Sequence, residues 1–426
     1  MDWINGGKFY QTGQPESNWD LWVKADGAGI FDSGSIRWYD DPLKRDLSRG
    51  NGRFMNENSF WNHLPQPIVG LAPMDGVTDA VFRAITARHG GPDISFTEFT
   101  SVDRIVLGHD PDLSDLRYSE IERPVIAQVF GTEPEAFYRA AHLICELGFD
   151  GIDINMGCPS KTIAGAGAGA GLIRTPERAR EILQRTRQGI WDWAAGQEIG
   201  RIGLPAVVVE SIPRVKACWF SQTPDPAEAA LRRTIPVSVK TRLGYNQVVI
   251  EDWIPSLLSE SPAAITLHGR TLAQRYRGEA DWEAIARAAE IVRGSGTLIL
   301  GNGDIRSAAT AVRRIRETGV HGVLLGRAAM GNPWIFRTGD SIRTAVRTGE
   351  TPPADPCISP VEKLAVALEH AELFDRNRGT LSFRVVRKYL SAYCRGFKNA
   401  SELRQRLVRV DTLRELEAIL QPVVCG

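Results

Sequence analysis

Between residues 68 and 326, short apolar runs rich in β-branched residues alternate with stretches whose apolar residues recur every three or four positions. The first pattern predicts buried parallel strands, and the second predicts amphipathic helices. The eight predicted strands are Ile68–Met74, Ile94–Phe99, Val125–Phe130, Gly151–Asn155, Val237–Arg242, Ala264–His268, Leu298–Gly301 and Gly322–Gly326. Helices are predicted between them, for instance at Glu133–Leu147, Pro176–Gln188, Trp282–Arg293 and Ser307–Thr318. Eight strand–helix units over about 280 residues predict an α/β fold of the TIM (β/α)8 barrel type.

A doubly wound α/β sheet is the alternative arrangement for such a pattern. That fold places a G-x-G-x-x-G motif directly after its first strand. Here the corresponding turn reads Pro73-Met74-Asp75-Gly76. The missing motif favours the barrel.

After Pro333 the strand pattern ends. Prolines at positions 352, 353, 356 and 360 mark a linker, and helices are predicted at Val361–Phe374, Leu381–Arg395, Ala400–Val408 and Thr412–Leu420. We therefore expect three parts. They are an N-terminal extension of unknown role at 1–60, a barrel at 61–345, and a smaller all-helical C-terminal domain at 357–426. An insertion at 190–235 interrupts the barrel and is expected to carry a short helix or two.

Composition adds a few exclusions. The 426 residues include 51 basic and 51 acidic side chains, so the net charge alone indicates no partner. No apolar run approaches the roughly 20 residues that cross a bilayer, and the first residues do not resemble a secretory signal. The six cysteines form no C-x-x-C pair and no cluster with zinc-ligand spacing. The sequence therefore predicts a cytoplasmic protein without a membrane segment or a bound metal.

The neutral total conceals a local excess of positive charge. Between Arg376 and Leu416 there are eleven Lys or Arg residues against three Asp or Glu. In the second C-terminal helix one face carries Val386, Tyr389, Leu390 and Tyr393, and the other carries Arg384, Arg387, Lys388 and Arg395. Such a face can be merely solvated, or it can bind a polyanion. In either case we expect this domain to contribute nothing to the barrel mouth.

Candidate chemistry lies where the predicted strands end, because TIM barrels build their active sites at the carboxyl face of the sheet. Five of the eight strand ends carry a chemically useful side chain, namely Gln128, Cys158, Lys240, His268 and Asn302. A purely structural barrel would have no reason to place such residues at equivalent positions.

The ends of the seventh and eighth strands have the composition of a phosphate pocket. They read Gly301-Asn302-Gly303-Asp304 and Gly326-Arg327. Glycine lets main-chain amides approach a phosphate, and Arg327 adds positive charge. With Gln128 and Lys240 opposite, the pocket fits flavin mononucleotide (FMN) lying across the barrel mouth. Lys240 would then stabilise the negative charge of reduced flavin, although a salt-bridged barrel lysine is the alternative.

Cys158 follows the fourth strand in the turn Gly157-Cys158-Pro159. This turn fixes the backbone and is expected to direct the thiol into the cavity. The tract Ala164–Gly171 (AGAGAGAG) follows, and its lack of side chains is expected to leave room for a large substrate. An inert buried thiol and a low-complexity linker are the alternatives.

Seven segments, occurring in order, resemble the tRNA-dihydrouridine synthase family. They are APMDGVTD (72–79), TEF (97–99), NMGCPSKT (155–162), PVSVKTRLGY (236–245), LHGRT (267–271), GNGDI (301–305) and LLGRAAMGNPWIF (324–336). The resemblance spans about 67 to 340 and extends more weakly over 360–420, where RKYLSAY (387–393) is similar to the family's basic RNA-binding helix. Residues 1–60 and the 190–235 insertion lie outside it.

The resemblance implies that Cys158 is a proton donor. It implies flavin contacts from Pro73, Met74, Asp75, Gln128, Lys240, His268, Asn302, Gly303, Asp304, Gly326 and Arg327. Together with the charge pattern, it makes Arg384, Arg387 and Lys388 candidate RNA contacts. Two residues depart from many members, Thr162 in place of a lysine and Tyr389 in place of a histidine. Both departures concern RNA contacts and substrate position more than chemistry.

The implied reaction is reduction of the C5=C6 bond of specific uridines in tRNA to 5,6-dihydrouridine. The implied cofactor is FMN, the reductant is NADPH or NADH, the partner is tRNA, and we expect a monomer. An FMN-dependent barrel acting on a small pyrimidine or enone would use the same pocket without needing the basic domain. A non-catalytic RNA-binding protein is the other alternative, but the intact Cys158, Lys240 and His268 disfavour it.

Overall fold

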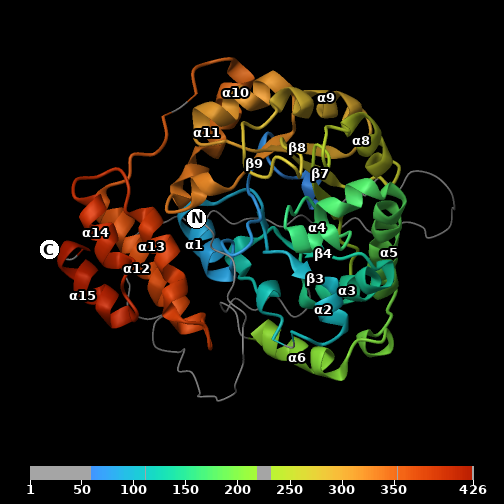
Figure 1. The fold of residues 1–426 in the computed structure, drawn as a ribbon, viewed down its shortest axis with the longest axis horizontal. Helices are drawn as coiled ribbons and strands as arrows, with labels where there is room; N and C mark the ends of the chain where they lie inside the picture. The colour runs from blue at the N-terminus through green and yellow to red at the C-terminus, as the bar shows by residue number, and fades with distance from the viewer. Residues whose placement is uncertain (1–58, 111, 218–231, 353, 425–426) are drawn as a thin grey trace. The chain divides into compact units, whose positions relative to one another are not determined.

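The computed structural model describes residues 59–110, 112–217, 232–352 and 354–424. A parallel sheet curves into a barrel at its centre (Figure 1). Its strands are β1 (Ile68–Leu71), β2 (Ser95–Phe96), β3 (Thr100–Ser101), β4 (Val125–Phe130), β5 (Gly151–Met156), β6 (Val237–Arg242), β7 (Ala264–His268), β8 (Leu298–Asn302) and β9 (Gly322–Leu325). They pair in the order β1-β9-β8-β7-β6-β5-β4-β2, and β3 also pairs with β4.

The ring closes between β1 and the segment that enters β2. The Leu71 amide donates to the Ile94 carbonyl oxygen (2.9 Å), and the Asp93 amide donates to the Val69 carbonyl oxygen (3.1 Å). With the helices between its strands, this closed parallel sheet confirms the predicted TIM barrel.

The predicted second strand, Ile94–Phe99, was wrong as one continuous element. Within it only Ser95–Phe96 (β2) is a strand, and β3 begins at Thr100, beyond the predicted end. The ladder to β4 is interrupted just after the Thr97 amide, which still donates to the Ile126 carbonyl oxygen (2.9 Å). There the Gln128 amide donates to the Thr97 hydroxyl (2.9 Å) and not to a main-chain carbonyl. The interruption releases the backbone around Glu98 from the sheet.

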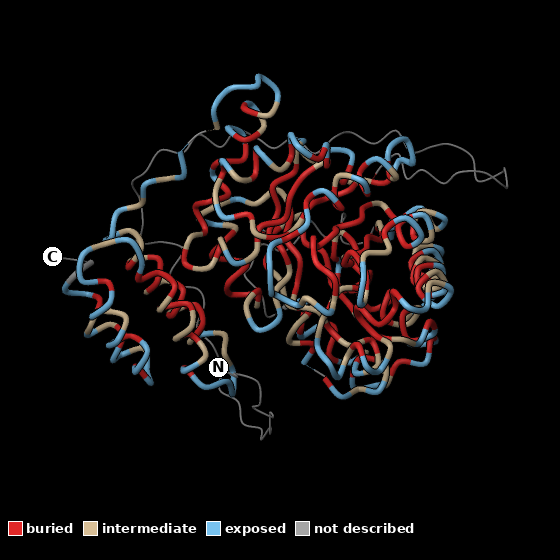
Figure 2. Tube along the Cα trace, turned by 45° about the horizontal axis from the view of Figure 1, so that its top comes forward, coloured by how far each residue is buried: buried red, intermediate tan, exposed pale blue. Residues whose placement is uncertain are grey.

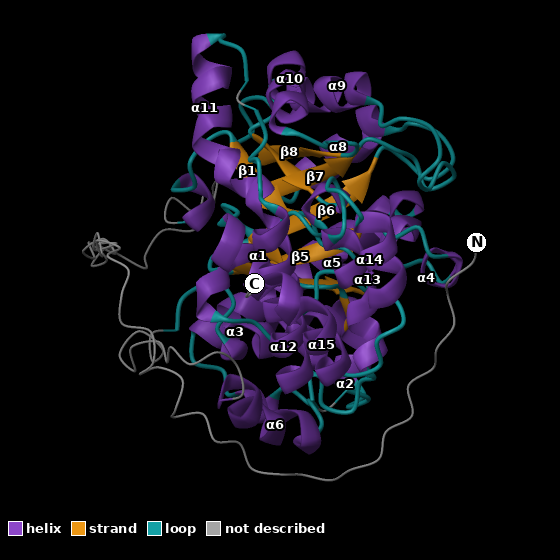
Figure 3. Cartoon of the chain, turned by 90° about the vertical axis from the view of Figure 1, so that its left-hand side faces the viewer, coloured by secondary structure: helices purple, strands orange, loops and turns teal. Residues whose placement is uncertain are grey.

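Helices cover the outside of the strands (Figure 3). They are α1 (Ala80–Gly90), α2 (Val102–Val106), α3 (Pro134–Leu147), α4 (Lys161–Gly165), α5 (Pro176–Ala194), α6 (Ala206–Ala217), α8 (Ile250–Leu258), α9 (Trp282–Val292), α10 (Ala308–Thr318) and α11 (Gly339–Thr348). Short 3-10 turns are η1 (Phe60–Asn62), η2 (Ser114–Leu116), η3 (Glu120–Glu122), η4 (Gly169–Arg174), η5 (Ile199–Arg201), η6 (Arg327–Ala329) and η7 (Pro333–Thr338). Aspartate caps begin two of the helices, since Asp79 accepts from the Phe82 amide and Asp281 from the Ala284 amide, both at 2.8 Å.

The barrel interior changes from apolar to polar along the strands. Its apolar part is a separate cluster, almost without solvent exposure, of Trp61, Ile68, Ala72, Ile94, Phe96, Ile126, Ala264, Leu300 and Leu324 (Figure 2). Alternate residues of a strand share one face, so Gln128 continues the row of Ile126 and Asn302 continues the row of Leu300. The same rows therefore deliver polar side chains to the carboxyl ends of the strands.

The C-terminal helices are α12 (Pro360–Asn377), η8 (Phe383–Val386), α13 (Arg387–Tyr393), α14 (Ala400–Leu407) and α15 (Leu413–Val424). The predicted helix Leu381–Arg395 is therefore a 3-10 turn followed by a shorter α-helix. Its predicted apolar face is confirmed, since Val386, Tyr389, Leu390 and Tyr393 are all buried. These helices and the barrel belong to one compact unit.

One expectation about the C-terminal helices was wrong. They do reach the barrel mouth, because Lys388 and Tyr389 of α13 hydrogen-bond to main-chain atoms of the loop between β1 and α1. The basic and apolar faces of α13 are thus not simply a solvent side and a packing side.

The segment predicted as an insertion contains the end of α5, η5 and α6. Residues 218–231 lie outside the described residues, and so does the predicted N-terminal extension apart from Ser59 and Phe60. None of the described helices is long and apolar enough to span a membrane.

Candidate active site

The predicted site residues lie side by side at the ends of neighbouring strands. The register pairs Asn155 with Lys240, Arg242 with His268, and His268 with Asn302. These residues come from four consecutive strands of the ring, β5 to β8. The barrel therefore gathers at one face side chains that are widely separated in the sequence.

Gln128, Asp153 and Asn155 form a buried hydrogen-bonded chain at this face. Gln128 Nε2 donates to Asp153 Oδ2 (2.7 Å), and Asn155 Nδ2 donates to Gln128 Oε1 (3.0 Å). Ser238 Oγ donates to Asp153 Oδ1 (2.6 Å). Burial raises the pKa of Asp153 to about 6, although these hydrogen bonds oppose the rise. The chain fixes the orientation of the Gln128 amide and leaves it one N–H for a ligand.

Lys240 lies beside this chain but is not part of it. Its ammonium group forms no hydrogen bond and no ion pair within 4.0 Å with any described residue. Burial, with Arg242 nearby, lowers the pKa of Lys240 to about 8. The salt-bridged barrel lysine considered from the sequence is therefore not what the structure contains. Even partial burial of a cation without a partner costs free energy unless a ligand supplies the partner.

The region around His268 is strongly positive. Burial lowers the pKa of His268 far below its ordinary value, and four cations add to the shift, namely Lys240, Arg242, Arg270 and Arg327. The imidazole is therefore neutral at physiological pH. Its Nε2 lies 3.3 Å from Arg270 Nη1 and accepts a hydrogen bond if the other ring nitrogen carries the proton.

Asp304 organises two of these arginines. Its carboxylate accepts hydrogen bonds from Arg270 (2.5 Å), from the Ala280 amide (2.9 Å) and from Arg327 (2.9 Å). Although burial opposes the shift, these donors lower the pKa of Asp304. With both oxygens occupied, the carboxylate is an unsuitable direct ligand for a flavin phosphate. The contact between Asp304 and flavin stays a prediction. The main chain of Asp304, which has a φ of 53°, is a better candidate for that contact than its side chain.

Glycines at the ends of β8 and β9 let neighbouring side chains pack directly against the main chain. A methyl group at Gly303 would lie 2.7 Å from Ala280 Cβ and 3.2 Å from His268 Cδ2, and Gly303 has a φ of 132°. A methyl group at Gly326 would lie 3.1 Å from Met74 Sδ. A side chain at Gly303 would clash and strain the backbone, and one at Gly326 would displace the Met74 side chain. Gly303 is buried and Gly326 partly buried, and Arg327, 61% exposed, lies beside these strand ends.

Cys158 is held in its turn by Asn155. Asn155 Oδ1 accepts hydrogen bonds from the amides of Gly157 (3.0 Å) and Cys158 (2.8 Å). The thiol is 8% exposed, and burial raises its pKa, with a smaller contribution from Asp75. The group therefore remains a protonated thiol at neutral pH, as a proton donor must.

The Gly/Ala tract packs against the same turn. The Ala170 amide donates to the Cys158 carbonyl oxygen (3.3 Å), and a Cβ on Gly169 would lie 3.0 Å from Cys158 Cβ. Residues 168–171 are buried. The small side chains of this half of the tract thus let it pack closely on the Cys158 turn, whereas the sequence suggested room for a substrate.

The predicted contacts Pro73, Met74 and Asp75 lie in the β1–α1 loop. Pro73 and Met74 are partly buried, and Asp75 is exposed. The loop is closed by Thr78, whose hydroxyl accepts from the Met74 amide at 2.9 Å. Met74 lies against the end of β9 at Gly326, so the loop borders the strand ends predicted to bind phosphate.

The three predicted RNA contacts have different environments. Arg384 is 66% exposed and pairs with Asp411 (2.5 Å). Arg387 pairs with the same carboxylate (2.5 Å) and also donates to the carbonyl oxygens of Val410 (2.7 Å) and Arg409 (2.9 Å). Lys388 donates to the Gly76 carbonyl oxygen and lies over the Tyr389 ring. Their predicted contacts with RNA stay a prediction, and of the three Arg384 is the most accessible.

Sequence reasoning named Asn155, Arg242 and Arg270 as strand-end residues but gave them no role, and it omitted Asp153. All four are buried at the mouth. Arg242 donates to the Gly157 carbonyl oxygen (2.6 Å) and to that of Arg275 (3.1 Å), and Arg270 donates to that of Arg277 (3.3 Å). The available signal was a polar or charged side chain within, or just after, a buried strand. Among the described residues, no group of three or more His, Cys, Asp or Glu side chains is arranged to hold a metal ion.

Comparison with known proteins identifies the group to which these features belong. The family model described as "Dihydrouridine synthase (Dus)" matches residues 70–190 and 227–424. "Probable tRNA-dihydrouridine synthase 2" of Bacillus subtilis (strain 168) is 32% identical over 373 residues, covering 86% of this chain and 96% of that protein. "Probable tRNA-dihydrouridine synthase" of Staphylococcus aureus (strain MRSA252) is 30% identical over 374 residues, covering 86% and 95%.

A solved structure titled as DHODH from Eimeria tenella in complex with ferulenol is also similar, at 13% identity and a TM-score of 0.36. It covers 58% of this chain and 64% of that one. Similarity at this level bears on neither substrate nor mechanism.

Proposed function

The chain belongs to the dihydrouridine synthase family, and from that premise we propose that it reduces the C5=C6 bond of uridines in tRNA to 5,6-dihydrouridine. The proposal includes FMN at the barrel mouth, NADPH as the reductant and Cys158 as the proton donor. The observation that carries it is the partly buried, unpartnered Lys240 at a positively charged barrel mouth, beside a protonated thiol.

The residues at the mouth fit FMN. Glycine at positions 303 and 326, with the exposed Arg327 beside them, suits a monophosphate. Lys240 of β6 and neutral His268 of β7 come from neighbouring strands and can face the polar edge of a flavin ring, and Gln128 has one N–H to donate. Several cations and an unpartnered ammonium favour a ligand that carries negative charge.

When bound, FMN supplies the hydride that adds to C6 of the uracil. The protein supplies the proton for C5, from the Cys158 thiol, so that one hydride and one proton complete the reduced bond. Asn155 fixes the thiol through its two hydrogen bonds to the turn, and burial keeps the thiol protonated. Proton donation by a positioned group typically contributes about 10²–10⁴-fold to a rate. Lys240 holds positive charge where electron density accumulates on the reduced ring.

Features around the mouth support a polynucleotide substrate. Tyr276 is 65% exposed in the β7–α9 loop, between the exposed Arg275 and Arg277. Buried Arg242 and Arg270 hold the carbonyl oxygens of those two neighbours, so the loop presents its aromatic ring outward. An exposed ring between two cations suits an unstacked base and its phosphates. A small pyrimidine would require no such surface.

The decisive experiment is reconstitution. The purified protein, loaded with FMN and supplied with NADPH and an unmodified tRNA transcript, should form dihydrouridine that mass spectrometry detects in the digested RNA. Free uridine and uracil should remain unreduced. Reduction of a free pyrimidine without reaction on tRNA would identify the small-molecule enzyme instead, and RNA binding without FMN uptake would identify the non-catalytic protein.

A further inference from the structure

The β1–α1 loop connects two regions that were expected to be separate. It carries the predicted flavin contacts Pro73, Met74 and Asp75, and Met74 lies against the end of β9 at Gly326. Its other end, Gly76 to Asp79, lies against α13 of the C-terminal helices. The contacts that fix the position of this loop therefore affect the shape of the barrel mouth.

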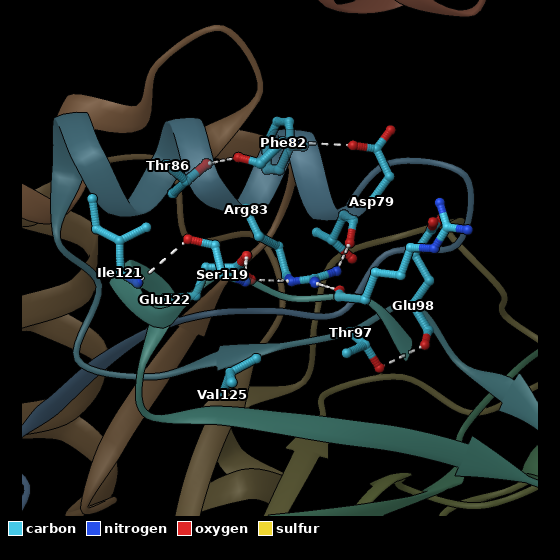
Figure 4. A network of polar contacts seen from close by, with 12 residues as sticks. Asp79, Phe82, Arg83, Thr86, Thr97, Glu98, Ser119, Ile121, Glu122 and Val125 are labelled. Atoms are coloured by element: carbon cyan, nitrogen blue, oxygen red, sulfur yellow. Dashed lines mark hydrogen bonds and ion pairs between the residues drawn. The ribbon is translucent and has the colours of Figure 1, made fainter. Parts of the chain in front are cut away.

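From the barrel side, Arg83 holds the loop. Its guanidinium donates to the Thr78 carbonyl oxygen (2.7 Å) and pairs with Glu122 (2.6 Å), and both charged side chains are buried. Figure 4 shows Arg83 extending from α1 toward Glu122, with Asp79 and Glu98 on its other side. Inside the loop, Thr78 bonds to both the amide and the carbonyl oxygen of Met74. The anchor is thus transmitted to the residue that touches β9.

From the other side, α13 holds the loop. Tyr389 Oη lies 2.7 Å from the Val77 carbonyl oxygen and 2.7 Å from Asp79 Oδ2, and it can donate to either. Lys388 donates to the Gly76 carbonyl oxygen. Burial and Asp79 raise the pKa of Tyr389 well above its usual value, so its hydroxyl remains a donor.

These contacts are not needed merely to attach the C-terminal helices. Arg88 and His89 at the opposite end of α1 pair with Glu369 of α12, and Arg337 of η7 pairs with Glu362 of α12 (3.8 Å). Gly331 packs so closely on Ala392 that a Cβ would lie 2.3 Å from its carbonyl carbon. The helices are therefore secured elsewhere, and Tyr389 and Lys388 are left to act on the loop.

Tyr389 also cannot serve the RNA directly. It is completely buried, stacked on His370 with ring centroids 4.5 Å apart, and it packs on Phe82. The sequence relates Tyr389, which replaces a histidine common in the family, to RNA contacts. Its surroundings connect it to the barrel instead.

We propose that Tyr389 and Lys388 are positioning residues for the flavin site, acting through the β1–α1 loop. The C-terminal helices thereby complete the cofactor pocket even when no RNA is bound. This inference rests on the proposed function, because it takes FMN as the ligand of the barrel mouth.

Lys388 acts on the loop through its hydrogen bond to the Gly76 carbonyl oxygen. Its charge also opposes the effect of burial, Asp79 and Asp115, which together raise the pKa of Glu98 to about 8. Lys388→Met would remove both contributions.

The test compares two tyrosines on the same face of α13. Tyr389→Phe removes only the hydroxyl that reaches the loop. Tyr393→Phe is the matched control, because it removes an equally buried hydroxyl that bonds His370 (3.2 Å) within the C-terminal helices. Lys388→Met is a second variant, and Tyr389→Phe combined with Lys388→Met is a third. FMN affinity is measured by quenching of flavin fluorescence in the absence of RNA and NADPH.

Tyr389→Phe is expected to weaken FMN binding by about fivefold to tenfold, since hydrogen bonds to charged groups are stronger than neutral ones. The double variant should weaken it further, and Tyr393→Phe should stay within about twofold of the wild type. Hydrogen exchange without FMN should be faster over residues 73–79 in Tyr389→Phe, in Lys388→Met and in the double variant, and unchanged in Tyr393→Phe. Equal losses in both tyrosine variants, or unchanged exchange over the loop, would overturn the proposal. Failure of the wild type to bind FMN would overturn the proposed function, while the exchange measurement would still judge the coupling.

Discussion

Positive charge gathers in two regions of this chain, the barrel mouth and the basic face of the C-terminal helices, and the two differ in how the charges are paired. At the mouth, Lys240 is partly buried and has no partner among the described residues. On the helices, Arg384 and Arg387 share the carboxylate of Asp411, and Arg387 holds two further carbonyl oxygens. A count of basic residues would have ranked the helices first.

The difference teaches that burial without a partner is a better indication of a ligand site than density of charge. Leaving a cation desolvated and unpaired costs the folded protein free energy, and a bound anion can recover it. An exposed pair contributes about 0–1 kcal/mol and stabilises local structure at most modestly. The comparison predicts that charges at the mouth affect function more than stability, and that Arg387 does the reverse.

The largest expected effect concerns the thiol that the mouth surrounds. Cys158→Ala should lower dihydrouridine formation by about 10²–10⁴-fold, because the proton for C5 loses its positioned donor. FMN binding and NADPH oxidation should be unchanged. Mass spectrometry of digested tRNA measures dihydrouridine formation. Absorbance at the flavin and NADPH bands measures FMN binding and NADPH oxidation. Cys145→Ala, which removes a buried thiol in α3, is the control, and a normal rate in Cys158→Ala would remove the thiol from the mechanism.

Lys240→Met tests the mouth side of the comparison directly. Reduction of bound flavin by NADPH should slow by about 10²-fold, as for loss of one preorganised electrostatic contact. The melting temperature without FMN should rise at neutral pH. Burial lowers the pKa of Lys240 from 10.5 to about 8, so the charged form costs the folded state stability below that pH.

The same pKa predicts a pH profile for the wild type. Because the charged amine is the useful form, flavin reduction should decline as pH rises through about 8, and the decline should be absent in Lys240→Met. A lower melting temperature in Lys240→Met would show that the lysine is a structural residue, and the contrast between the two regions would fail.

Arg387→Ala and Arg384→Ala test the helical side. Arg387→Ala should destabilise the protein by about 1–2 kcal/mol through the loss of its hydrogen bonds, whereas Arg384→Ala should change stability by less than about 0.5 kcal/mol. Thermal unfolding measures both. FMN affinity should be unchanged in each, and a marked loss there would place these arginines with the mouth.

The same residues can be tested for RNA binding. If Arg384, Arg387 and Lys388 all contacted phosphates, replacing all three would reduce the slope of log K against log salt by about three. With Arg387 and Lys388 bonded to protein carbonyl oxygens, a reduction of about one is expected, most of it from Arg384. Binding titrations with tRNA at several salt concentrations measure the slope. An unchanged slope would show that none of the three residues contacts an RNA phosphate.

The smallest effect concerns Glu98, which lies between the two regions. Burial, with Asp79 and Asp115 nearby, raises its pKa from 4.5 to about 8, while Lys388 and Arg83 oppose the shift. The native state therefore favours the protonated carboxyl, and its stabilising effect is lost as pH rises from about 4.5 through 8. Between pH 5.5 and pH 9 the melting temperature of Glu98→Gln should fall less than that of the wild type, and the two decreases should differ by about 2–4 °C. Glu402→Gln, at an exposed site of α14, should match the wild type.

The sequence by itself determined the fold and most of the residues at the mouth. Strand and helix periodicities are local, and alternate residues of a strand must face the same side, so reading the strand ends identified Gln128, Lys240, His268 and Asn302. Cys158 followed from the same reasoning, because its turn comes directly after a strand. Family motifs added the chemistry to positions that the periodicity had already selected.

Only the tertiary structure decided which charges are paired. Asp304 lies 34 residues from Arg270, and Asp411 lies 24 residues from Arg387, so neither pair has a signal in the sequence. The contact between Tyr389 and the β1–α1 loop spans about 310 residues and turned a supposed RNA-facing helix into a support for the mouth. Periodicity shows which face of an element is buried, but it does not show what lies opposite. Pairing energies depend on distances of a few ångströms, and those distances exist only after the chain has folded.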